Sequence, residues 1–337
     1  MILVTGATGM LGSHLIWHLL QNNNRVVASC RDMNKIALVE KVFKFYTSNA
    51  EEYLHRIDWV VTDFKSSSAL ENILPRITSI YHCAAYVSLT DTDPKNYDFN
   101  SQSTKLLVEM SLRMNIQKFC LVSSIATCGT TNEDTSVDEN TAWIDTSLVS
   151  LYARSKYESE KIVWEGIQKG LNALIVNPGV IIGASANSSG SAQLFELIKK
   201  GLIFYTNGGS GYVDVRDVVK IMVQLTTENH MNEKFIIVAE NCKTKQILDS
   251  IADEMKLKRP YIRIGSYSMI IVAYLLGFVG KILDFKPKID LSFAKTSTNI
   301  QKYNATKIKK LLNYEFISIS QSIREVCVFL EKDQSKN

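Results

Sequence analysis

Three glycines near the start of the chain have the type and spacing that suit the binding of a phosphate group. Gly6, Gly9 and Gly12 follow the apolar run Ile2-Leu3-Val4 and precede a segment with leucines at positions 11, 15, 19 and 20. A strand that turns sharply into a helix leaves free backbone N–H groups at the helix N-terminus, where anions bind. Gly6 would permit the turn, Gly9 the close approach of a pyrophosphate, and Gly12 the packing of the helix on the sheet. The segment predicts a dinucleotide site.

The Gly-x-x-Gly-x-x-Gly spacing resembles that of the short-chain dehydrogenase/reductase superfamily. That resemblance demands a Tyr-x-x-x-Lys pair on a helix and a Ser or Thr at the end of an earlier strand. The Tyr-x-x-x-Lys pattern alone has low specificity, because the sequence contains it three times, at Tyr152/Lys156, Tyr157/Lys161 and Tyr303/Lys307.

Context separates the three pairs. The apolar run Phe119–Val122 ends in Ser123-Ser124, and Ser124 lies five residues before Gly129, as in the extended members of the superfamily. Tyr152 then opens a helical segment at the expected distance. The resemblance therefore implies Ser124, Tyr152 and Lys156 as catalytic residues, and implies a solvated helical pair at Tyr157/Lys161.

The chemistry explains these residue types. A carbonyl that accepts hydride develops negative charge on oxygen, which a phenol can neutralise by donating a proton while a hydroxyl holds the oxygen. Tyr152 would be the acid and Ser124 the holder. A free phenol has a pKa of about 10, and we expect the ammonium of Lys156, one helical turn on, to lower it. By resemblance, Lys156 would also bond the nicotinamide ribose.

Other segments match the cofactor-binding segments of the superfamily. Most of these segments follow the predicted strands. One is a predicted helix in which Asn100 and Thr104 match the Asn-x-x-x-Thr pattern of the superfamily. With the glycine turn, the resemblance implies that the cofactor contacts Gly6, Thr8, Gly9, Met10, Leu11, Gly12, Arg31, Asp63, Phe64, Cys83, Ala84, Ala85, Asn100, Val122, Tyr152, Lys156, Pro178, Gly179 and Val180.

The end of the second strand bears on the choice of cofactor. NAD enzymes usually place an acid here for the ribose hydroxyls, whereas an arginine accommodates a 2′-phosphate. Cys30 occupies the acid position and Arg31 follows it. A guanidinium matches a phosphate with two parallel hydrogen bonds. We therefore expect NADP(H). The alternative is that Arg31 is a surface arginine and Asp32 serves the ribose of NAD(H).

The segment Asn177-Pro178-Gly179-Val180 narrows the branch of the superfamily. Sugar-nucleotide epimerases and dehydratases usually have Arg and Asn where this chain has Asn177 and Val180. The chain is more similar to the dihydroflavonol reductase and 3β-hydroxysteroid dehydrogenase branch, which implies a small, largely apolar ketone, aldehyde or alcohol as substrate. Residues expected to line its pocket are Tyr86, Val87, Ala126, Trp143, Val180, Ser189 and Phe195.

Two rival functions stay open at this point. One is an NAD-dependent sugar-nucleotide epimerase or dehydratase. The other is a sensor or assembly protein that binds NADPH without turnover, although such members commonly lose the tyrosine or lysine that this chain keeps.

Strands and amphipathic helices alternate over residues 1–178, which predicts a Rossmann-type, doubly wound parallel sheet. We expect a cofactor domain at residues 1–183. Residues 184–332 would form a smaller, mostly helical substrate region, interleaved with strands that return to the main sheet. Within it we expect a helix at Ala192–Lys200, a turn at Gly208–Gly211, and a helix at Val218–Leu225 with Asp217 as its N-cap.

Composition agrees with a cytoplasmic enzyme. The 337 residues are 46% apolar and carry a net charge of +4. The excess lysines gather between residues 281 and 310, as on a solvated face, and match no known nucleic-acid-binding module, which argues against nucleic acid as a partner. Six cysteines without Cys-x-x-Cys spacing predict free thiols. No histidine has a partner at metal-ligand spacing, so no metal is expected. By resemblance, a homodimer is expected through the helices that hold Asn100 and Tyr152.

Residues 264–283 allow two interpretations. Ile264 to Gly280 carries no charge and is close to the minimum of about 17 residues that can span a bilayer. Serines, tyrosines and glycines dilute it. We expect a buried or dimer-contact helix, and the alternative is contact with a membrane surface through 264–283, helped by the lysines that follow.

Overall fold

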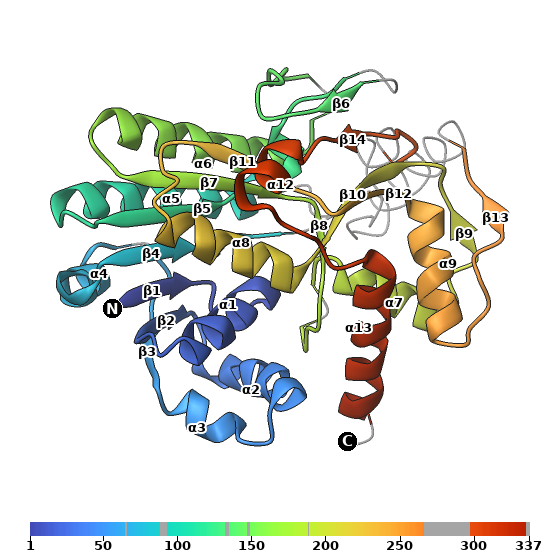
Figure 1. Cartoon of the computed structure of the whole chain (residues 1–337), viewed down its shortest axis with the longest axis horizontal. Helices are drawn as coiled ribbons and strands as arrows, with labels where there is room; N and C mark the ends of the chain where they lie inside the picture. The colour runs from blue at the N-terminus through green and yellow to red at the C-terminus, as the bar shows by residue number, and fades with distance from the viewer. Residues whose placement is uncertain are drawn as a thin grey trace, which may run out of the picture.

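The architecture is that of two unequal parts built on one large sheet (Figure 1). The computed structural model describes residues 1–64, 66–87, 93–131, 135–146, 149–187, 189–265 and 297–334. Most of segment 264–283 therefore lies outside the described residues. Among the helices of the described ranges, none combines the length and apolar character needed to cross a membrane.

The large sheet has seven parallel strands. Its spatial order is β11-β7-β5-β4-β1-β2-β3. The strands are β1 (Ile2–Thr5), β2 (Val26–Cys30), β3 (Ile57–Val61), β4 (Ser79–His82), β5 (Lys118–Val122), β7 (Ala173–Pro178) and β11 (Lys234–Ile237). The chain runs outward from β1 to β3 and then crosses back to β4. The switch point between β1 and β4 is where such sheets bind ligands.

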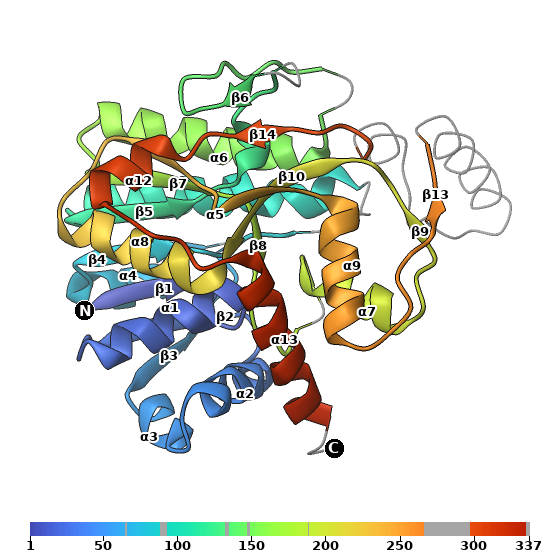
Figure 2. The same cartoon turned by 45° about the vertical axis from the view of Figure 1, so that its right-hand side comes forward.

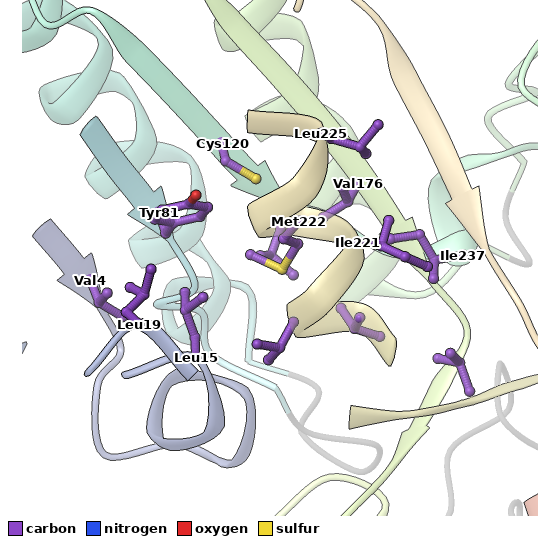
Figure 3. Close-up of a cluster of buried hydrophobic side chains, with 14 of the residues drawn as sticks. Val4, Leu15, Leu19, Tyr81, Cys120, Val176, Ile221, Met222, Leu225 and Ile237 are labelled. Carbon is purple, nitrogen blue, oxygen red and sulfur yellow. The ribbon is translucent and has the colours of Figure 1, made fainter. Parts of the chain in front are cut away.

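Alternating side chains of each strand enter two separate cores. Val4, Tyr81 and Val176 face one side, and their neighbours Leu3, Ile80 and Ile175 face the other. Figure 3 shows the first core, in which Leu15 and Leu19 meet Ile221, Met222 and Leu225 over the strands. Because both faces of the sheet are buried, the strands read as continuous apolar runs rather than as alternating polar and apolar residues.

Helices cover both faces. On the side of the first core lie α1 (Met10–Gln21) and α8 (Val215–Thr227), with α2 (Ile36–Tyr46), α3 (Ala50–Leu54) and α12 (Thr306–Leu312) around them. On the other side lie α4 (Ser68–Ile73), α5 (Pro94–Arg113) and α6 (Leu151–Gln168). The predicted Rossmann-type α/β fold is therefore confirmed.

The smaller part has its own hydrophobic core. Three helices, α7 (Ala192–Lys199), α9 (Thr244–Glu254) and α13 (Ile319–Gln334), pack together there, beside the sheet, as Figure 2 shows. Strand β10 (Gly209–Asp214) pairs with β8 (Val180–Ile182) and β12 (Glu240–Lys243). Two further pairs join β9 (Phe204–Tyr205) to β13 (Ile262–Arg263) and β6 (Ser136–Val137) to β14 (Lys302–Tyr303). Strand β11 returns from this region to the large sheet.

Two local predictions were wrong. The turn predicted at Gly208–Gly211 is largely strand β10, because glycine lets this strand approach its neighbours closely. A Cβ on Gly211 would lie 2.7 Å from the side chain of Val238. The helix predicted from Val218 begins at Val215, and its N-cap is Asp214, whose carboxylate accepts from the Arg216 N–H at 2.8 Å.

Candidate active site

The glycine turn lies against the loop that follows β4, at the switch point of the sheet. Gly6 has a φ of +65°, and a Cβ there would lie 2.7 Å from the backbone of Ala84. A Cβ on Gly12 would collide with the carbonyl oxygen of Gly6. Gly12 therefore lets helix α1 pack on the turn itself, rather than on the sheet as its sequence position suggested.

The N-terminus of α1 suits an anion. No side chain in the described part of the chain caps this helix at Gly9, and its first turn contains no acidic residue. A Cβ on Gly9 would meet only the Gly6 oxygen, at 3.3 Å, so the space beyond is open. Unbonded N–H groups and the helix dipole both favour negative charge there. The turn thus fits the pyrophosphate of a nicotinamide dinucleotide.

The buried side chain of His82 connects the end of β1 to helix α5 through hydrogen bonds. His82 accepts at Nδ1 from the Thr5 hydroxyl (2.8 Å), and Thr5 in turn accepts from the Ala84 N–H (3.0 Å). Thr104 gives its hydroxyl proton to the Asn100 carbonyl (2.7 Å), so it accepts from His82 Nε2 (3.1 Å). In the neutral imidazole this arrangement places the proton on Nε2. Burial lowers the pKa of His82 to about 3.

Asn100 lies at the end of this chain of hydrogen bonds and is itself buried. Its side chain clamps the backbone of Tyr86, accepting from the N–H at 2.6 Å and donating to the carbonyl at 3.1 Å. It also donates to the Ser155 hydroxyl at 2.9 Å. Asn100 therefore fixes the loop after β4 to helix α6.

Helix α6 presents Tyr152 to Ser124. The helix begins after Ser150, whose hydroxyl accepts from the Ala153 N–H at 3.1 Å. Ser124 follows β5, where the Ala126 N–H donates to its Oγ at 3.2 Å. The Ser124 side chain lies beside the half-buried Tyr152 phenol and favours its ionised form. The structure thus brings these two predicted residues together.

Lys156 lies one helical turn beyond Tyr152. Its side chain is only 4% exposed, and its ammonium donates to the Val122 carbonyl at 2.5 Å. Burial lowers the pKa of Lys156 to about 8, while Glu160 and Cys83 oppose that shift. The ammonium therefore remains mostly protonated at neutral pH.

The expected lowering of the tyrosine pKa does not occur in this arrangement. Burial raises the pKa of Tyr152, and the hydrogen bond from Ser124 offsets this only in part. Burial is the largest influence on the phenol, and the Lys156 ammonium donates to the Val122 carbonyl instead. The phenol accordingly stays protonated at neutral pH, as a proton donor must be.

Residues predicted to bind the adenosine end of the cofactor follow β2 and β3. Arg31 is exposed after β2, and its guanidinium lies 5.6 Å from the centre of the Phe99 ring. Asp32 is the N-cap of the short helix at Met33–Lys35, accepting from the Asn34 N–H at 2.9 Å. Phe64, with a φ of +54°, is buried and its ring lies edge-on to His82.

The remaining predicted cofactor residues lie at the ends of strands or just beyond them. Cys83, Ala84 and Ala85 are partly exposed after β4, as are Thr8 in the turn after β1 and Met10 and Leu11 at the start of α1. Pro178 and Gly179 are buried, and Val180 is half-buried. A Cβ on Gly179 would lie 2.5 Å from the Gly211 carbonyl oxygen, so glycine is needed where β8 meets β10.

The residues predicted to line the substrate pocket differ in how far they are buried. Tyr86 is half-buried and packs edge-on against Tyr97, while Val87 is 41% exposed beside it. Ala126 is half-buried near Ser124, and Ser189 is exposed. Phe195 lies in the core of the smaller part with only 2% exposed, so the structure gives it a packing role instead of an open pocket wall.

Trp143 is stacked on Tyr157, with ring centres 4.4 Å apart. The two rings line a cavity of about 260 Å³, together with Thr127, Glu160, Trp164 and Lys234. Tyr157 thus packs on an aromatic ring, while Lys161 pairs with Glu158 on the surface, at 3.1 Å.

Sequence reasoning missed a buried carboxylate next to this site. Glu160 is 3% exposed and accepts hydrogen bonds from Thr127 (2.5 Å) and Asn177 (2.6 Å). The sequence spacing could have identified Glu160, because residues 152, 156 and 160 are four positions apart and therefore lie on one helix face. The partners Thr127 and Asn177 come from distant segments, and no spacing predicts them.

Known proteins resemble this chain in sequence along most of its length. Sterol demethylase protein B of Methylococcus capsulatus is 25% identical over 278 residues, covering 81% of this chain and 80% of that protein. Cinnamoyl-CoA reductase CAD2 of Medicago truncatula is 24% identical over 296 residues, covering 79% and 87%.

Two solved structures share the fold. Gre2 of Candida albicans in complex with NADPH has a TM-score of 0.74 at 19% identity, covering 98% of both chains. UDP-glucose 4-epimerase of Thermotoga maritima with UDP-glucose has a TM-score of 0.75 at 18% identity, covering 99% of both chains.

The sequence model of an NAD-binding family, described as male sterility protein, matches residues 4–224. That range includes the glycine turn, Ser124 and the Tyr152/Lys156 pair, and it exceeds half of the chain. The chain therefore belongs to this NAD-binding family, within the extended short-chain dehydrogenase/reductase superfamily, and is an NAD(P)-dependent oxidoreductase of that type.

Proposed function

We propose that this protein uses NADP(H) to reduce the carbonyl of a small, largely apolar ketone or aldehyde, or to oxidise the matching alcohol. The observation that carries the proposal is the placement of the Tyr152 phenol beside the Ser124 side chain, with the buried Lys156 ammonium one helical turn away. Ser124 follows β5, which borders β4 on one side, and the glycine turn follows β1, which borders β4 on the other side.

Each member of the group has a role in the proposal. The cofactor, when bound, supplies the hydride. Ser124 and Tyr152 hold the substrate oxygen, and the Tyr152 phenol donates a proton to it as negative charge develops. Lys156 places a positive charge beside the site. It has three N–H donors, of which Val122 accepts one, so two can serve the nicotinamide ribose.

Preference for NADP(H) rests on the residues after β2. Asp32 already serves as a helix cap, and Arg31 is exposed and oriented by the Phe99 ring. A guanidinium held in this way favours a 2′-phosphate, whereas no carboxylate occupies the Cys30 position to accept from ribose hydroxyls.

An apolar substrate is supported by the residues around the site and by the names of relatives. Ala126 and Val180 are half-buried, and Val87 is exposed, on segments that follow the strands. Relatives that align with most of this chain are named for a sterol demethylase and a cinnamoyl-CoA reductase.

Calorimetric titration with NADPH and NADH is the first test. Tighter binding of NADPH supports the role of Arg31, and a panel of aromatic, aliphatic and steroid carbonyls is then followed by the absorbance of the reduced nicotinamide. NADH preference, tightly retained NAD, or protection from unfolding by nucleotide sugars would instead favour the epimerase or dehydratase function. Binding of NADPH with no turnover across the panel would favour a sensor.

A further inference from the structure

Three oxygen atoms gather around one buried amide, two from the turn after β5 and one from α6. The Asn177 Nδ2 lies 2.6 Å from Glu160 Oε1, 2.9 Å from Thr127 Oγ1 and 3.1 Å from the Ser124 carbonyl oxygen, which share its two N–H groups. Asn177 is fully buried, and Glu160 is 3% exposed. A carboxylate is costly to bury unless its oxygens accept hydrogen bonds, and here an amide and a hydroxyl provide them.

The cluster holds the backbone that carries Ser124. The Thr127 hydroxyl lies 2.8 Å from the Ser124 carbonyl and 2.5 Å from Glu160, so its one proton is shared between them. On the other side of the same residue, the Ala126 N–H binds the Ser124 side chain. The Ser124 turn is therefore fixed through both its carbonyl and its hydroxyl.

The same carboxylate acts on Lys156. Glu160 lies four residues beyond Lys156 on α6, so the two side chains share a helix face. Its negative charge favours the ammonium and opposes the burial that lowers the pKa of Lys156 to about 8. Tyr152, Lys156 and Glu160 thus form a line along the helix.

We propose that Glu160 is a positioning residue of the active site. Its carboxylate, bonded to Thr127 and Asn177, fixes the turn that presents Ser124 and supplies the negative charge that keeps Lys156 protonated. This role rests on the function proposed above for Ser124, Tyr152 and Lys156. Glu160 itself touches neither substrate nor cofactor in this proposal.

Other charged groups face this pair and must be considered. Around Lys156 these are Cys83, whose thiol is kept protonated by burial, and His82, which is neutral. Around Glu160 these groups are the thiol of Cys128 and three side chains that line the adjacent cavity, Glu139, Lys161 and Lys234. Glu139 accepts from the Ile236 N–H, and Lys161 pairs with Glu158. Glu160 is the largest source that favours the Lys156 ammonium.

Glu160→Gln tests the charge while keeping the shape. We expect the pKa of Lys156 to fall by about one unit, the size of the effect of one nearby opposite charge. The pH above which kcat/KM for carbonyl reduction declines should fall by a similar amount. Glu158→Gln is the matched control, because it removes an exposed acid from the same helix. It should leave both values unchanged.

Thr127→Val tests the hydrogen bonds while keeping the charge. We expect kcat to fall at least tenfold with little change in the pH profile, and Thr127→Ser, which retains the hydroxyl, to restore it. This pair also carries the test if Glu160→Gln does not fold. Unchanged kcat in Thr127→Val, or an unchanged pH profile in a folded Glu160→Gln, would overturn the proposal.

A readout without turnover separates this proposal from the proposed function. In protein labelled with ¹³C at the lysine ε-carbon, the Lys156 signal is assigned by its loss in Lys156→Met and titrated with pH. A lower pKa in Glu160→Gln supports the charge role even where no carbonyl is reduced. An unchanged pKa contradicts it even where the wild-type enzyme is active.

Discussion

The Tyr152 phenol and the Lys156 ammonium show how much the immediate surroundings of a side chain decide. The two residues share a helix face, yet burial raises the pKa of Tyr152 and lowers that of Lys156. Both shifts follow from the cost of placing charge where water is excluded. At neutral pH the phenol keeps its proton, which matches the direction of carbonyl reduction.

Tyr152→Phe removes the proposed acid and leaves the ring. We expect kcat for carbonyl reduction to fall by about 10²- to 10⁴-fold, the usual contribution of a general acid. The dissociation constant for NADPH should change little, because the phenol hydroxyl is not expected to contribute much to cofactor affinity. Steady-state kinetics and calorimetry check the two quantities. Turnover at the wild-type rate would refute the assignment.

Arg31→Gln removes the guanidinium expected to bind the 2′-phosphate. A charge-assisted hydrogen bond contributes roughly 1.5–3 kcal/mol, so NADPH affinity should fall by about 10- to 100-fold while NADH affinity stays the same. Arg25→Gln is the control, since Arg25 is an exposed arginine just before the other end of β2. Equal losses for the two cofactors would contradict the role of Arg31.

At the scale of elements, Gly9 and Gly12 have different roles in the turn between β1 and α1. Gly12 is enclosed by the turn itself, whereas Gly9 has a φ of −82° and faces open space. Substitution should therefore damage the fold at one position and the ligand site at the other.

Gly12→Ala should lower the free energy of unfolding by roughly 1–3 kcal/mol, the usual cost of overpacking. Gly9→Ala should leave stability nearly unchanged and weaken NADPH binding, because its methyl group would occupy space predicted for the pyrophosphate. Urea unfolding and calorimetry measure the two effects. Equal stability losses in both variants would show that the turn does not divide these tasks.

At the scale of the whole molecule, Asp217 ties the C-terminal segment to helix α8. Its carboxylate accepts from the Tyr314 hydroxyl and from the Ile317 N–H, both at 2.9 Å. The side chain is 1% exposed, and burial raises the pKa of Asp217 to about 6. Hydrogen bonds from the two donors reduce that shift without cancelling it.

The raised pKa has a consequence for stability. Because the folded state favours the protonated form, the contribution of Asp217 is fully present below its ordinary pKa of 3.8 and is lost as the pH rises through about 6. The loss is on the order of 3 kcal/mol, because one pKa unit corresponds to about 1.4 kcal/mol.

Asp217→Asn should therefore gain stability relative to the wild type as the pH rises from 4 to 7, since an amide can bond both partners without charge. Urea unfolding across this pH range gives the difference in free energy of unfolding between the two proteins. The contributions of the other titrating groups cancel in that difference. A difference that does not change with pH would contradict the raised pKa.

Local patterns determined the fold class and several positions in the site. The glycine turn, the apolar strands and the helical spacing of Tyr152 and Lys156 involve residues close together in sequence, so their geometry follows from one strand or one helical turn. These features predicted a Rossmann-type sheet, which was confirmed. The catalytic roles of Ser124, Tyr152 and Lys156 stay predictions, although the structure places the three side chains together.

Contacts between distant segments were decided only by the tertiary structure. The N-cap of α8 is Asp214 instead of Asp217, because Asp217 is buried against residues about one hundred positions later. Glu160 meets Thr127 and Asn177, and His82 joins β1 to α5, through parallel strands that bring remote residues to one sheet edge. Sequence spacing carries no record of such pairings, since burial and hydrogen-bond partners depend on how the elements pack.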